Sequence, residues 1–313
     1  MNTTKTMKAI RIHFYGGPEV LAYEEAPRPT PGAGEALVRV YAAGVNPVDW
    51  KISEGLLKDS LQYTFPFTPG WDLSGIVEES GPGVSFKLGD AVFSRPDIHR
   101  DGAYAEFTVV NASLLAQKPR SIDHIHAAGI PLAAMTAWQG LFEGAQLKRG
   151  QRVLIHAASG GVGSFAVQFA KWKGAHVIAT CSTGNVDFVK GLGADEVIDY
   201  RETDFTHMRR VDAVLDTLGG EIQERSWKVI KPFGILASIV SQPSAATAES
   251  LKMRHAFVVL KPDGKLLASI AKLVDAGKIK STVETVLPLS EARQAQELSR
   301  TGHTRGKIVL NVS

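Results

Sequence analysis

The pattern of apolar and polar positions changes near Ile125, which divides the chain into two regions. Before this point, short β-like runs are separated by glycine and proline. The runs are Ala36–Val45, Leu73–Val77, Ala91–Ser94 and Tyr104–Val110. Several short strands with turn residues between them are typical of an antiparallel barrel or sandwich. We therefore expect a β domain in the first third of the chain.

From Gln151 onward, short apolar runs alternate with helical stretches. The runs are Val153–Ile155, Val177–Ala179, Val197–Ile198, Ala213–Leu215 and Ile235–Ala237. Between the first two, Ser164–Lys173 has its apolar residues at helical spacing and ends at Gly174. This alternation predicts an α/β fold with a doubly wound parallel sheet. The tail returns to helix over Lys265–Ala276 and Ser290–Ser299 and closes with a strand, Lys307–Val312.

Composition narrows the class of protein. The chain has 313 residues, with 35 Lys and Arg against 32 Asp and Glu and a net charge of +3. This length predicts two domains, and the balanced charge argues against a nucleic-acid partner. The first eight residues do not resemble a signal peptide, and no apolar stretch is long enough for a membrane helix. We expect a cytoplasmic protein with no membrane partner.

A glycine turn is the most informative segment of the chain. The apolar strand at Val153 runs directly into Ser159, Gly160, Gly161, Val162 and Gly163, and a helix follows. Glycines allow the backbone to approach a pyrophosphate, and a helix N-terminus offers free N–H groups to that anion. The strand, turn and helix context that a dinucleotide site requires is present.

The segment after the second strand indicates which dinucleotide binds. A site specific for NAD places Asp or Glu about 20 residues beyond the first glycine. Here the segment is Ala179–Thr183, and it contains no acid. Small hydroxylated residues suit a 2′-phosphate, which a carboxylate would repel, so NADPH is favoured over NADH.

Four motifs resemble the medium-chain dehydrogenase/reductase superfamily, and within it the zinc-independent quinone oxidoreductase branch that includes zeta-crystallin. They are Tyr41–Asp49, Pro69–Gly75, Ala157–Gly163 and Arg305–Val309. The resemblance implies a GroES-like catalytic domain made of residues 1–124 and 263–313, with a Rossmann domain over 125–262 between them. It also implies a homodimer formed through the edge strand near Ala256–Leu260.

The resemblance allows a residue-level test for zinc. In zinc alcohol dehydrogenases of this superfamily, the ligand positions correspond to Asn46, Trp71 and Leu132 of this chain, and a conserved Glu corresponds to Asp72. None of the three can supply a usual zinc ligand. The segment 95–102 is short and lacks the cysteines of a structural zinc lobe. His124 and His126 have no third ligand nearby in sequence, so we expect no metal. The sequence also has no flavin motif, so we expect no flavin.

Cofactor-binding roles follow from the resemblance, residue by residue. The glycine turn would hold the pyrophosphate, and Lys307 would reach toward the cofactor phosphates. Thr136 would meet the nicotinamide ribose. The other expected contacts are Ser182, Thr183, Asn185 and Tyr200 at the adenosine phosphate, and Leu218, Gly219 and Val240 at the ends of later strands.

Asn46, Lys51 and Thr136 are the expected catalytic residues. Asn46 could donate a hydrogen bond to a substrate carbonyl, and Lys51 could stabilise the oxygen that gains negative charge. The alternative for Lys51 is a surface ion pair with Asp49.

Without metal or flavin, the chemistry that these residues favour is hydride transfer from NADPH to a small conjugated carbonyl compound. The first hypothesis is a quinone oxidoreductase. An alkenal or enone double-bond reductase would use the same machinery, and a non-catalytic NADPH-binding sensor or structural protein would keep the same glycine turn.

Cys181 is expected to be buried rather than nucleophilic.

Overall fold

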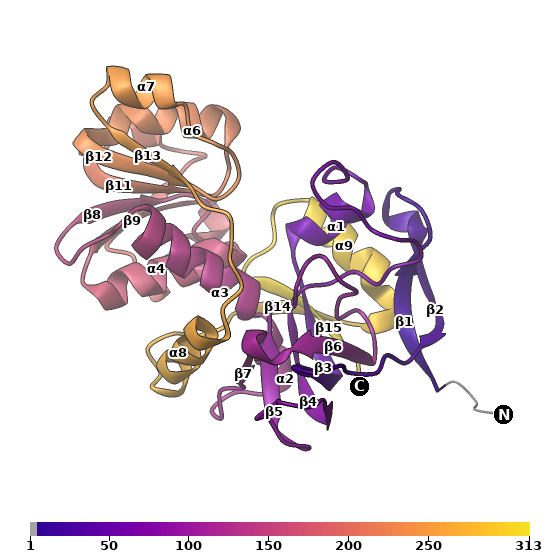
Figure 1. Cartoon of the computed structure of the whole chain (residues 1–313). Helices are drawn as coiled ribbons and strands as arrows, with labels where there is room; N and C mark the ends of the chain where they lie inside the picture. Colours follow the sequence, from indigo (N-terminus) through magenta and orange to yellow (C-terminus); the bar gives the residue numbers. More distant parts are fainter. Residues whose placement is uncertain (1–4) are drawn as a thin grey trace. The chain divides into compact units, whose positions relative to one another are not determined.

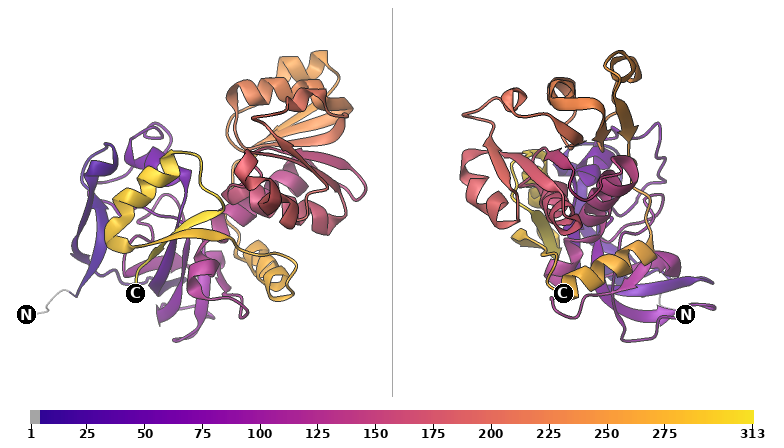
Figure 2. Two further views of the ribbon diagram at one scale, coloured as in Figure 1. Left: turned by 180° about the vertical axis from the view of Figure 1, so that it is seen from behind. Right: turned by 90° about the vertical axis from the view of Figure 1, so that its left-hand side faces the viewer.

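A computed structural model describes residues 5–313 as two compact units (Figures 1 and 2). Unit 1 consists of the described residues up to Leu132, together with Pro262–Gly277 and Ser281–Ser313, and unit 2 consists of Ala133–Lys261 and Lys278–Lys280. The first boundary follows Leu132 rather than residue 124, because helix α2 (His124–Ala128) packs against several strands of unit 1. Residues 278–280 also differ from the expected division, since they belong to unit 2.

Unit 1 is built on a seven-stranded sheet whose main path has the order β14-β15-β3-β4-β5-β7, with β6 paired to β3. A hairpin of β1 and β2 adds a second, two-stranded sheet. The C-terminal strand β15 pairs antiparallel with β3, so the tail returns to the first domain as expected. The strands are β1 (Thr6–Ile12), β2 (Leu21–Pro27), β3 (Glu35–Val45), β4 (Leu73–Ser80), β5 (Ala91–Ser94), β6 (Phe107–Asn111), β7 (Leu115–Gln117), β14 (Val283–Pro288) and β15 (Lys307–Asn311).

The helices of unit 1 cover this sheet and begin at identifiable caps. Asp123 caps α2 by accepting from the His126 N–H, and Asp263 caps α8 (Gly264–Asp275). The other two helices are α1 (Pro47–Ser53) and α9 (Ala292–Arg300). The core joins the first third of the chain to the C-terminal tail, since Trp71, Tyr104 and Ile308 belong to one buried cluster.

Unit 2 is a six-stranded parallel sheet in the order β10-β9-β8-β11-β12-β13, flanked by helices (Figures 1 and 2). Its strands are β8 (Arg152–Ile155), β9 (His176–Cys181), β10 (Glu196–Asp199), β11 (Val211–Asp216), β12 (Ile230–Ser238) and β13 (Arg254–Phe257). The α-helices are α3 (Pro131–Trp138), α4 (Gly161–Lys173), α5 (Val186–Gly191), α6 (Gly220–Ser226) and α7 (Ala245–Ser250), and a π-helical turn spans Gln139–Gly144. The strand order reverses between β8 and β11, where open α/β sheets bind ligands.

The strand expected over Tyr104–Val110 is shorter in the structure. It begins at Phe107, and Tyr104 donates its N–H group to the Pro69 carbonyl instead. His124 and His126 lie on helix α2, which begins at the Asp123 cap.

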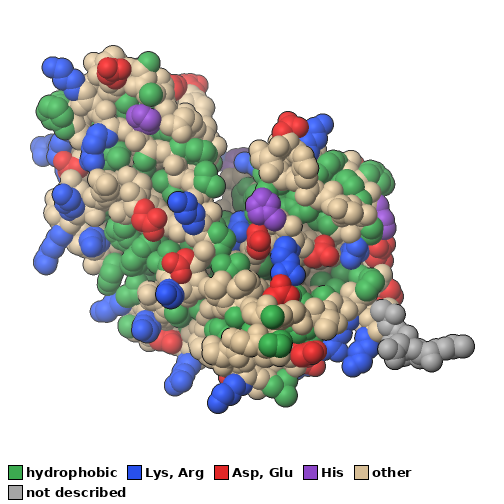
Figure 3. Space-filling model, in the orientation of Figure 1, with side chains coloured by type: hydrophobic (Ala, Val, Ile, Leu, Met, Phe, Trp, Pro, Cys, Tyr) green, Lys and Arg blue, Asp and Glu red, His purple; other side chains and the backbone are tan. Residues whose placement is uncertain are grey.

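Charged side chains of both signs are interspersed over the face of the molecule drawn in Figure 3. Within residues 5–313, no helix is long and apolar enough to cross a membrane.

Candidate active site and nucleotide-binding edge

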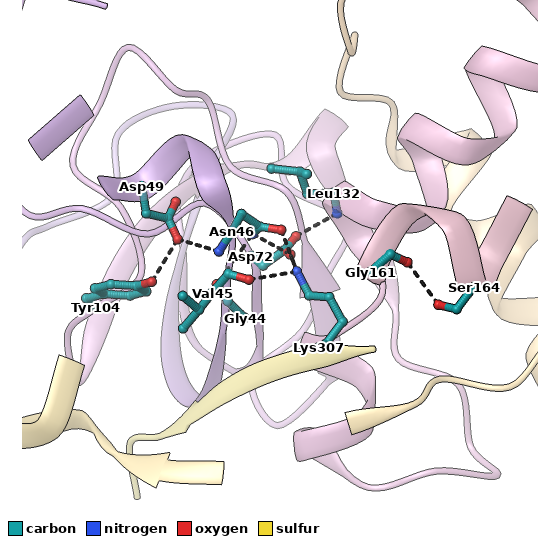
Figure 4. Close-up of polar contacts among 10 residues, drawn as sticks. All are labelled: Gly44, Val45, Asn46, Asp49, Asp72, Tyr104, Leu132, Gly161, Ser164 and Lys307. Atoms are coloured by element: carbon teal, nitrogen blue, oxygen red, sulfur yellow. Dashed lines mark hydrogen bonds and ion pairs between the residues drawn. The ribbon is translucent and has the colours of Figure 1, made fainter. Parts of the chain in front are cut away.

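Unit 1 contains a buried polar network of Asn46, Asp49, Asp72, Tyr104 and Lys307 (Figure 4). It starts at the sequence Asn46-Pro47-Val48-Asp49, which begins helix α1. Asn46 is the N-cap and Pro47 occupies the first helical turn, where its missing N–H costs nothing. The carboxylate of Asp49 accepts the Asn46 backbone N–H at 2.8 Å, the reciprocal half of a capping box.

The side-chain amide of Asn46 is fully engaged within unit 1. Its Nδ2 donates to Asp72 Oδ2 at 2.8 Å and, more weakly, toward the Gly44 carbonyl at 3.5 Å. Its Oδ1 accepts a hydrogen bond from the Lys307 ammonium. Since both Nδ2 hydrogens face protein acceptors, the expectation that Asn46 donates freely to a substrate carbonyl needs correction. Asn46 holds the network together.

Lys307 lies in this network with 4% of its surface exposed. Its Nζ donates to the Val45 carbonyl at 3.0 Å, to Asn46 Oδ1 and to Asp72 Oδ2 at 3.4 Å. An ammonium has three hydrogens, and all three are accounted for. The resemblance implied that Lys307 reaches toward the cofactor phosphates, but in the structure its amine neutralises Asp72.

Asp72 is the anionic centre of the network and is completely buried. Its Oδ1 accepts the Leu132 N–H at 2.6 Å, while Oδ2 faces Asn46 and Lys307. Burial raises the pKa of Asp72, and Lys307, Asn46 and the Leu132 N–H oppose that shift by stabilising the carboxylate. Two of the sequence positions aligned with zinc ligands, Asn46 and Leu132, therefore both bind one carboxylate.

Asp49 is the second buried carboxyl group. Its Oδ2 also accepts the Tyr104 hydroxyl at 2.7 Å, whereas its Oδ1 is buried with no partner among the described residues. Burial raises the pKa of Asp49 to about 7, against the stabilising effect of the Asn46 N–H and the Tyr104 hydroxyl. Burial likewise raises the pKa of Tyr104, so its hydroxyl stays protonated.

Two glycines of the sequence motifs make this packing possible. Gly70 has φ +95°, and a Cβ there would lie 2.1 Å from a ring carbon of Tyr104. At Gly44, a Cβ would lie 2.4 Å from the Ala128 carbonyl and 2.9 Å from Asp72 Cβ. Larger residues would therefore displace Tyr104 or Asp72.

Lys51 lies in the last turn of α1 and is partly exposed. Its Nζ sits 5.6 Å from the centre of the Trp50 ring. The alternative of a surface ion pair with Asp49 is wrong, because Asp49 is completely buried and bonded to Tyr104. Nearby in sequence, Tyr63 stacks on Phe67 with ring centres 4.3 Å apart and lies 6.0 Å from the ring of the buried Trp71.

In unit 2, the glycine turn leads into helix α4 as the sequence predicted. Gly160 is the N-cap, and no side chain caps this helix. A Cβ at Gly163 would lie 2.2 Å from the Ala157 carbonyl, so only glycine allows the helix to approach the strand this closely. The uncapped N-terminus and the glycines fit the requirements of a pyrophosphate cradle.

Ser182, Thr183, Asn185 and Tyr200 gather at the carboxyl ends of β9 and β10. The two strands pair in parallel with Cys181 opposite Asp199, and the Tyr200 N–H donates to the Cys181 carbonyl. Asn185 Nδ2 donates to Ser182 Oγ at 3.0 Å. Tyr200 is 52% exposed, and Thr183 is exposed. The structure thus brings these predicted adenosine-side residues together.

Leu218, Gly219 and Val240 lie beyond the ends of β11 and β12, and sequence reasoning missed the residue that positions them. Asp216 is completely buried at the end of β11. It accepts the N–H groups of Leu218 and Gly219, the Gln223 amide and the Ser238 hydroxyl. The signal in the sequence was a lone Asp at the end of an apolar run.

His156, at the end of β8, is a second residue that sequence reasoning missed. It lies between Thr180 Oγ1 at 3.1 Å and Ser226 Oγ at 2.9 Å, and burial lowers its pKa to about 4. It is therefore a neutral, structural histidine behind the glycine turn. Cys181 is buried as expected, and burial raises the pKa of its thiol to about 11.

Thr136 is buried on helix α3 and belongs to unit 2, whereas Asn46 and Lys51 belong to unit 1. Among residues 5–313, no three His, Cys, Asp or Glu side chains are grouped so that they could hold a metal ion. His124 instead bonds Ser74 Oγ, and His126 bonds its own helix cap, Asp123.

Comparison with known proteins places this architecture in a family. A model described as the alcohol dehydrogenase GroES-like domain matches residues 32–120, and one described as a zinc-binding dehydrogenase matches residues 192–310. The chain is 35% identical to a chloroplast envelope quinone oxidoreductase homolog of Arabidopsis thaliana over 98% of each chain. It is also 35% identical to the human mitochondrial NAD(P)H oxidoreductase RTN4IP1, over 89% of this chain and 82% of the relative.

A solved structure agrees with these relatives. The quinone oxidoreductase from Coxiella burnetii has a TM-score of 0.91 and 35% identity, and the match covers 99% of this chain and 100% of that one. The fold, the glycine turn and these likenesses together lead to one assignment. The chain belongs to the quinone oxidoreductase-like branch of the medium-chain dehydrogenase/reductase superfamily and is an oxidoreductase that uses a nicotinamide cofactor.

Proposed function

We propose that this enzyme transfers hydride from NADPH to a quinone without a catalytic metal. The observation that carries the proposal is the buried network, in which Lys307 and Asn46 bind Asp72. The positions that correspond to zinc ligands, Asn46, Trp71 and Leu132, carry no usual zinc-binding side chain. A lysine ammonium supplies the positive charge there and neutralises Asp72. Carbonyl reduction at such a site depends on positioning and on hydrogen-bond donors rather than on a Lewis acid.

Within the chain, the glycine turn would hold the pyrophosphate, and Ser182, Thr183, Asn185 and Tyr200 would hold the adenosine end. When bound, the reduced nicotinamide supplies a hydride. The segment Ala179–Thr183 contains no acid, which favours the 2′-phosphate of NADPH. Leu218, Gly219, Val240 and Thr136 complete the proposed cofactor contacts, and the enzyme is proposed to be a cytoplasmic homodimer.

Lys51 is the proposed electrostatic residue for the acceptor. It is partly exposed, and the structure gives it no carboxylate partner among the described residues. As the carbonyl oxygen gains negative charge, an ammonium nearby would stabilise it, and water would deliver the proton that completes the hydroquinone. Asn46 positions this end of α1 through its bonds to Asp72 and Lys307.

The second candidate function is reduction of an alkenal or enone double bond. It needs the same hydride donor and the same stabilised oxygen, so the network supports it equally. A non-catalytic NADPH-binding role would need only the edge of unit 2, and the buried charges of unit 1 argue against it because such charges are expensive to retain without use.

The test is NADPH oxidation by chelator-treated enzyme with a quinone and a 2-alkenal offered separately, and with NADH as a control. We expect quinone turnover to exceed alkenal turnover and to survive chelation. Ser182→Asp should raise the KM for NADPH about tenfold and leave NADH nearly unchanged, because it places a carboxylate beside the 2′-phosphate.

Lys51→Met should lower kcat by about ten- to a hundredfold, while Lys58→Met, an exposed neighbour, should change it less than twofold. Loss of activity on chelation would contradict the zinc-free proposal. Tight NADPH binding with no turnover of either acceptor would contradict both enzyme functions.

A further inference from the structure

Arg95, just after strand β5, is a buried cation outside the network. Only 6% of its surface is exposed. Its single hydrogen bond among the described residues runs from Nη1 to the Pro96 carbonyl at 2.9 Å. Its Nε is buried and has no partner there. The edge of the guanidinium formed by Nε and Nη2 is therefore unused.

A buried charge without a contacting partner is costly. The carboxylates of Asp72, Asp97 and Asp49 act on Arg95 from a distance and reduce this cost, but within residues 5–313 none forms an ion pair with it. Burial lowers the pKa of Arg95, and the three carboxylates oppose that shift by stabilising the guanidinium cation. A cation retained in this state fits a ligand that brings the missing negative charge.

The position of Arg95 places it beside the network. Ser94 of β5 pairs with Leu73 of β4, and Arg95 and Asp72 each lie one position beyond this end of the antiparallel ladder. In an antiparallel pair, opposed side chains point to the same face of the sheet. Asp72, which meets Asn46 and Lys307, is accordingly the carboxylate with the largest electrostatic effect on the Arg95 guanidinium.

The loop that follows Arg95 is fixed to the aromatic side chains next to this face. The Tyr63 hydroxyl donates to the Ile98 carbonyl, and Trp71 Nε1 donates to the Arg100 carbonyl at 3.3 Å. The Asp101 carboxylate accepts the Thr68 N–H at 2.7 Å. The loop is thus held by three side-chain contacts that do not use the Arg95 guanidinium, so loop structure alone does not explain this residue.

The unused edge has a specific chemistry. Nε–H and Nη2–H are parallel donors whose spacing matches the two oxygens of a carboxylate. We propose that Arg95 is an anion-binding residue of the acceptor site and that the natural acceptor is a conjugated carbonyl compound bearing a carboxylate. This inference rests on the proposed hydride-transfer function. In the reaction, hydride adds to the unsaturated carbon, a proton from water completes the reduced product, NADPH becomes NADP⁺, and the carboxylate is unchanged.

Two acceptors that differ only in this charge provide the test: 4-oxo-2-pentenoate and its methyl ester. Wild-type enzyme should reduce the acid with kcat/KM about 50-fold above the ester. Arg95→Met should remove that preference by lowering turnover of the acid about 50-fold and turnover of the ester less than threefold. Arg95→Lys keeps the positive charge but loses the two parallel donors. Its preference for the acid over the ester should therefore lie between those of the wild type and Arg95→Met.

The matched control is Arg100→Met on the same loop. Arg100 has its side chain 45% exposed and pairs with Glu35, so its removal should leave both rates within about twofold. A binding readout does not depend on turnover: the saturated product 4-oxopentanoate should raise the Tm of wild-type enzyme, and Arg95→Met should abolish this shift.

Equal turnover of acid and ester by the wild type would overturn the inference, as would a loss in Arg95→Met that is the same for both. If Arg95→Met fails to fold, Arg95→Lys provides the test. An unchanged preference for the acid in folded Arg95→Lys would contradict the claim that the two parallel donors of Arg95 bind the carboxylate. Failure of the proposed function is distinct: no acceptor, including a neutral quinone, would be reduced. In that case the inference stands or falls on the 4-oxopentanoate shift alone.

Discussion

The two units hold their functional residues by different physical means. In unit 2, the glycine turn and the loops after β9 to β12 present backbone N–H groups and small side chains at one edge of a sheet, where the topology places them. In unit 1, the buried polar network joins side chains from four separate segments of the chain, around two carboxyl groups and one ammonium. The first arrangement depends on backbone conformation and the second on charge balance.

This difference predicts unequal sensitivity to loss of a charge, and Lys307→Met should have the largest effect. It leaves Asp72 buried without its ion pair, so we expect about 3–5 kcal/mol of lost stability, measured by denaturant unfolding. Lys231→Met in unit 2 is the control: it removes a partly exposed pair with Asp212 and should cost about 0–1 kcal/mol. Adding Asp72→Asn to Lys307→Met should recover part of the lost stability, because it removes the unpaired carboxylate. Equal losses of stability in Lys307→Met and Lys231→Met would contradict the difference between the two units.

In unit 2 the sensitive feature should be backbone space. Gly163→Val places a side chain 2.2 Å from the Ala157 carbonyl, so we expect about 2–3 kcal/mol of destabilisation and a large loss of NADPH affinity in a fluorescence titration. Gly160→Ala, whose Cβ would make an ordinary contact at 3.4 Å, should lower the free energy of unfolding by less than 1 kcal/mol. An NADPH affinity unchanged in Gly163→Val would show that the turn does not hold the cofactor.

The units should also respond to pH in opposite directions, beginning with Asp49. Its pKa is about 7 in the folded protein and near 3.8 when unfolded, so folding favours the protonated form. The stability that this group contributes is complete below pH 3.8 and is lost as pH rises through 7. Between pH 5.5 and 8.5, Asp49 should cost the wild type about 2 kcal/mol. Asp49→Asn should remove this part of the pH dependence, and an unchanged slope would rule out the titration of Asp49.

His156 should produce the opposite and smaller effect. Its pKa is about 4 in the folded protein against 6.5 when unfolded, so its contribution is present above pH 6.5 and is lost as pH falls toward 4. From pH 7.5 to 5.5 the loss should be about 1 kcal/mol. His156→Gln keeps polar atoms for Thr180 and Ser226. In thermal unfolding, it should reduce the loss of stability between pH 7.5 and 5.5. A loss equal to that of the wild type would contradict the titration of His156 as its cause.

How much the sequence could predict follows the same division. The Rossmann sheet and its glycine turn were predictable because they depend on local periodicity and short motifs, and so was the gathering of Ser182, Thr183, Asn185 and Tyr200 at the ends of two strands. The network was not, because its members are far apart in sequence and only the fold brings Lys307 to Asn46. The role expected for Lys307 and the free amide expected for Asn46 were wrong for that reason. Asp216 and His156 were missed because a polar residue at the end of a strand looks like the start of any loop.

The environment of Cys181 has a consequence for an enzyme of this proposed kind. Quinones and enones are electrophiles that alkylate thiolates, and the chain has one cysteine. Because its pKa is about 11, roughly one thiol in ten thousand is ionised at pH 7, and the side chain is also shielded from solvent. The protein therefore offers its own reactive substrates almost no soft nucleophile, which should protect it against covalent self-inactivation over many turnovers.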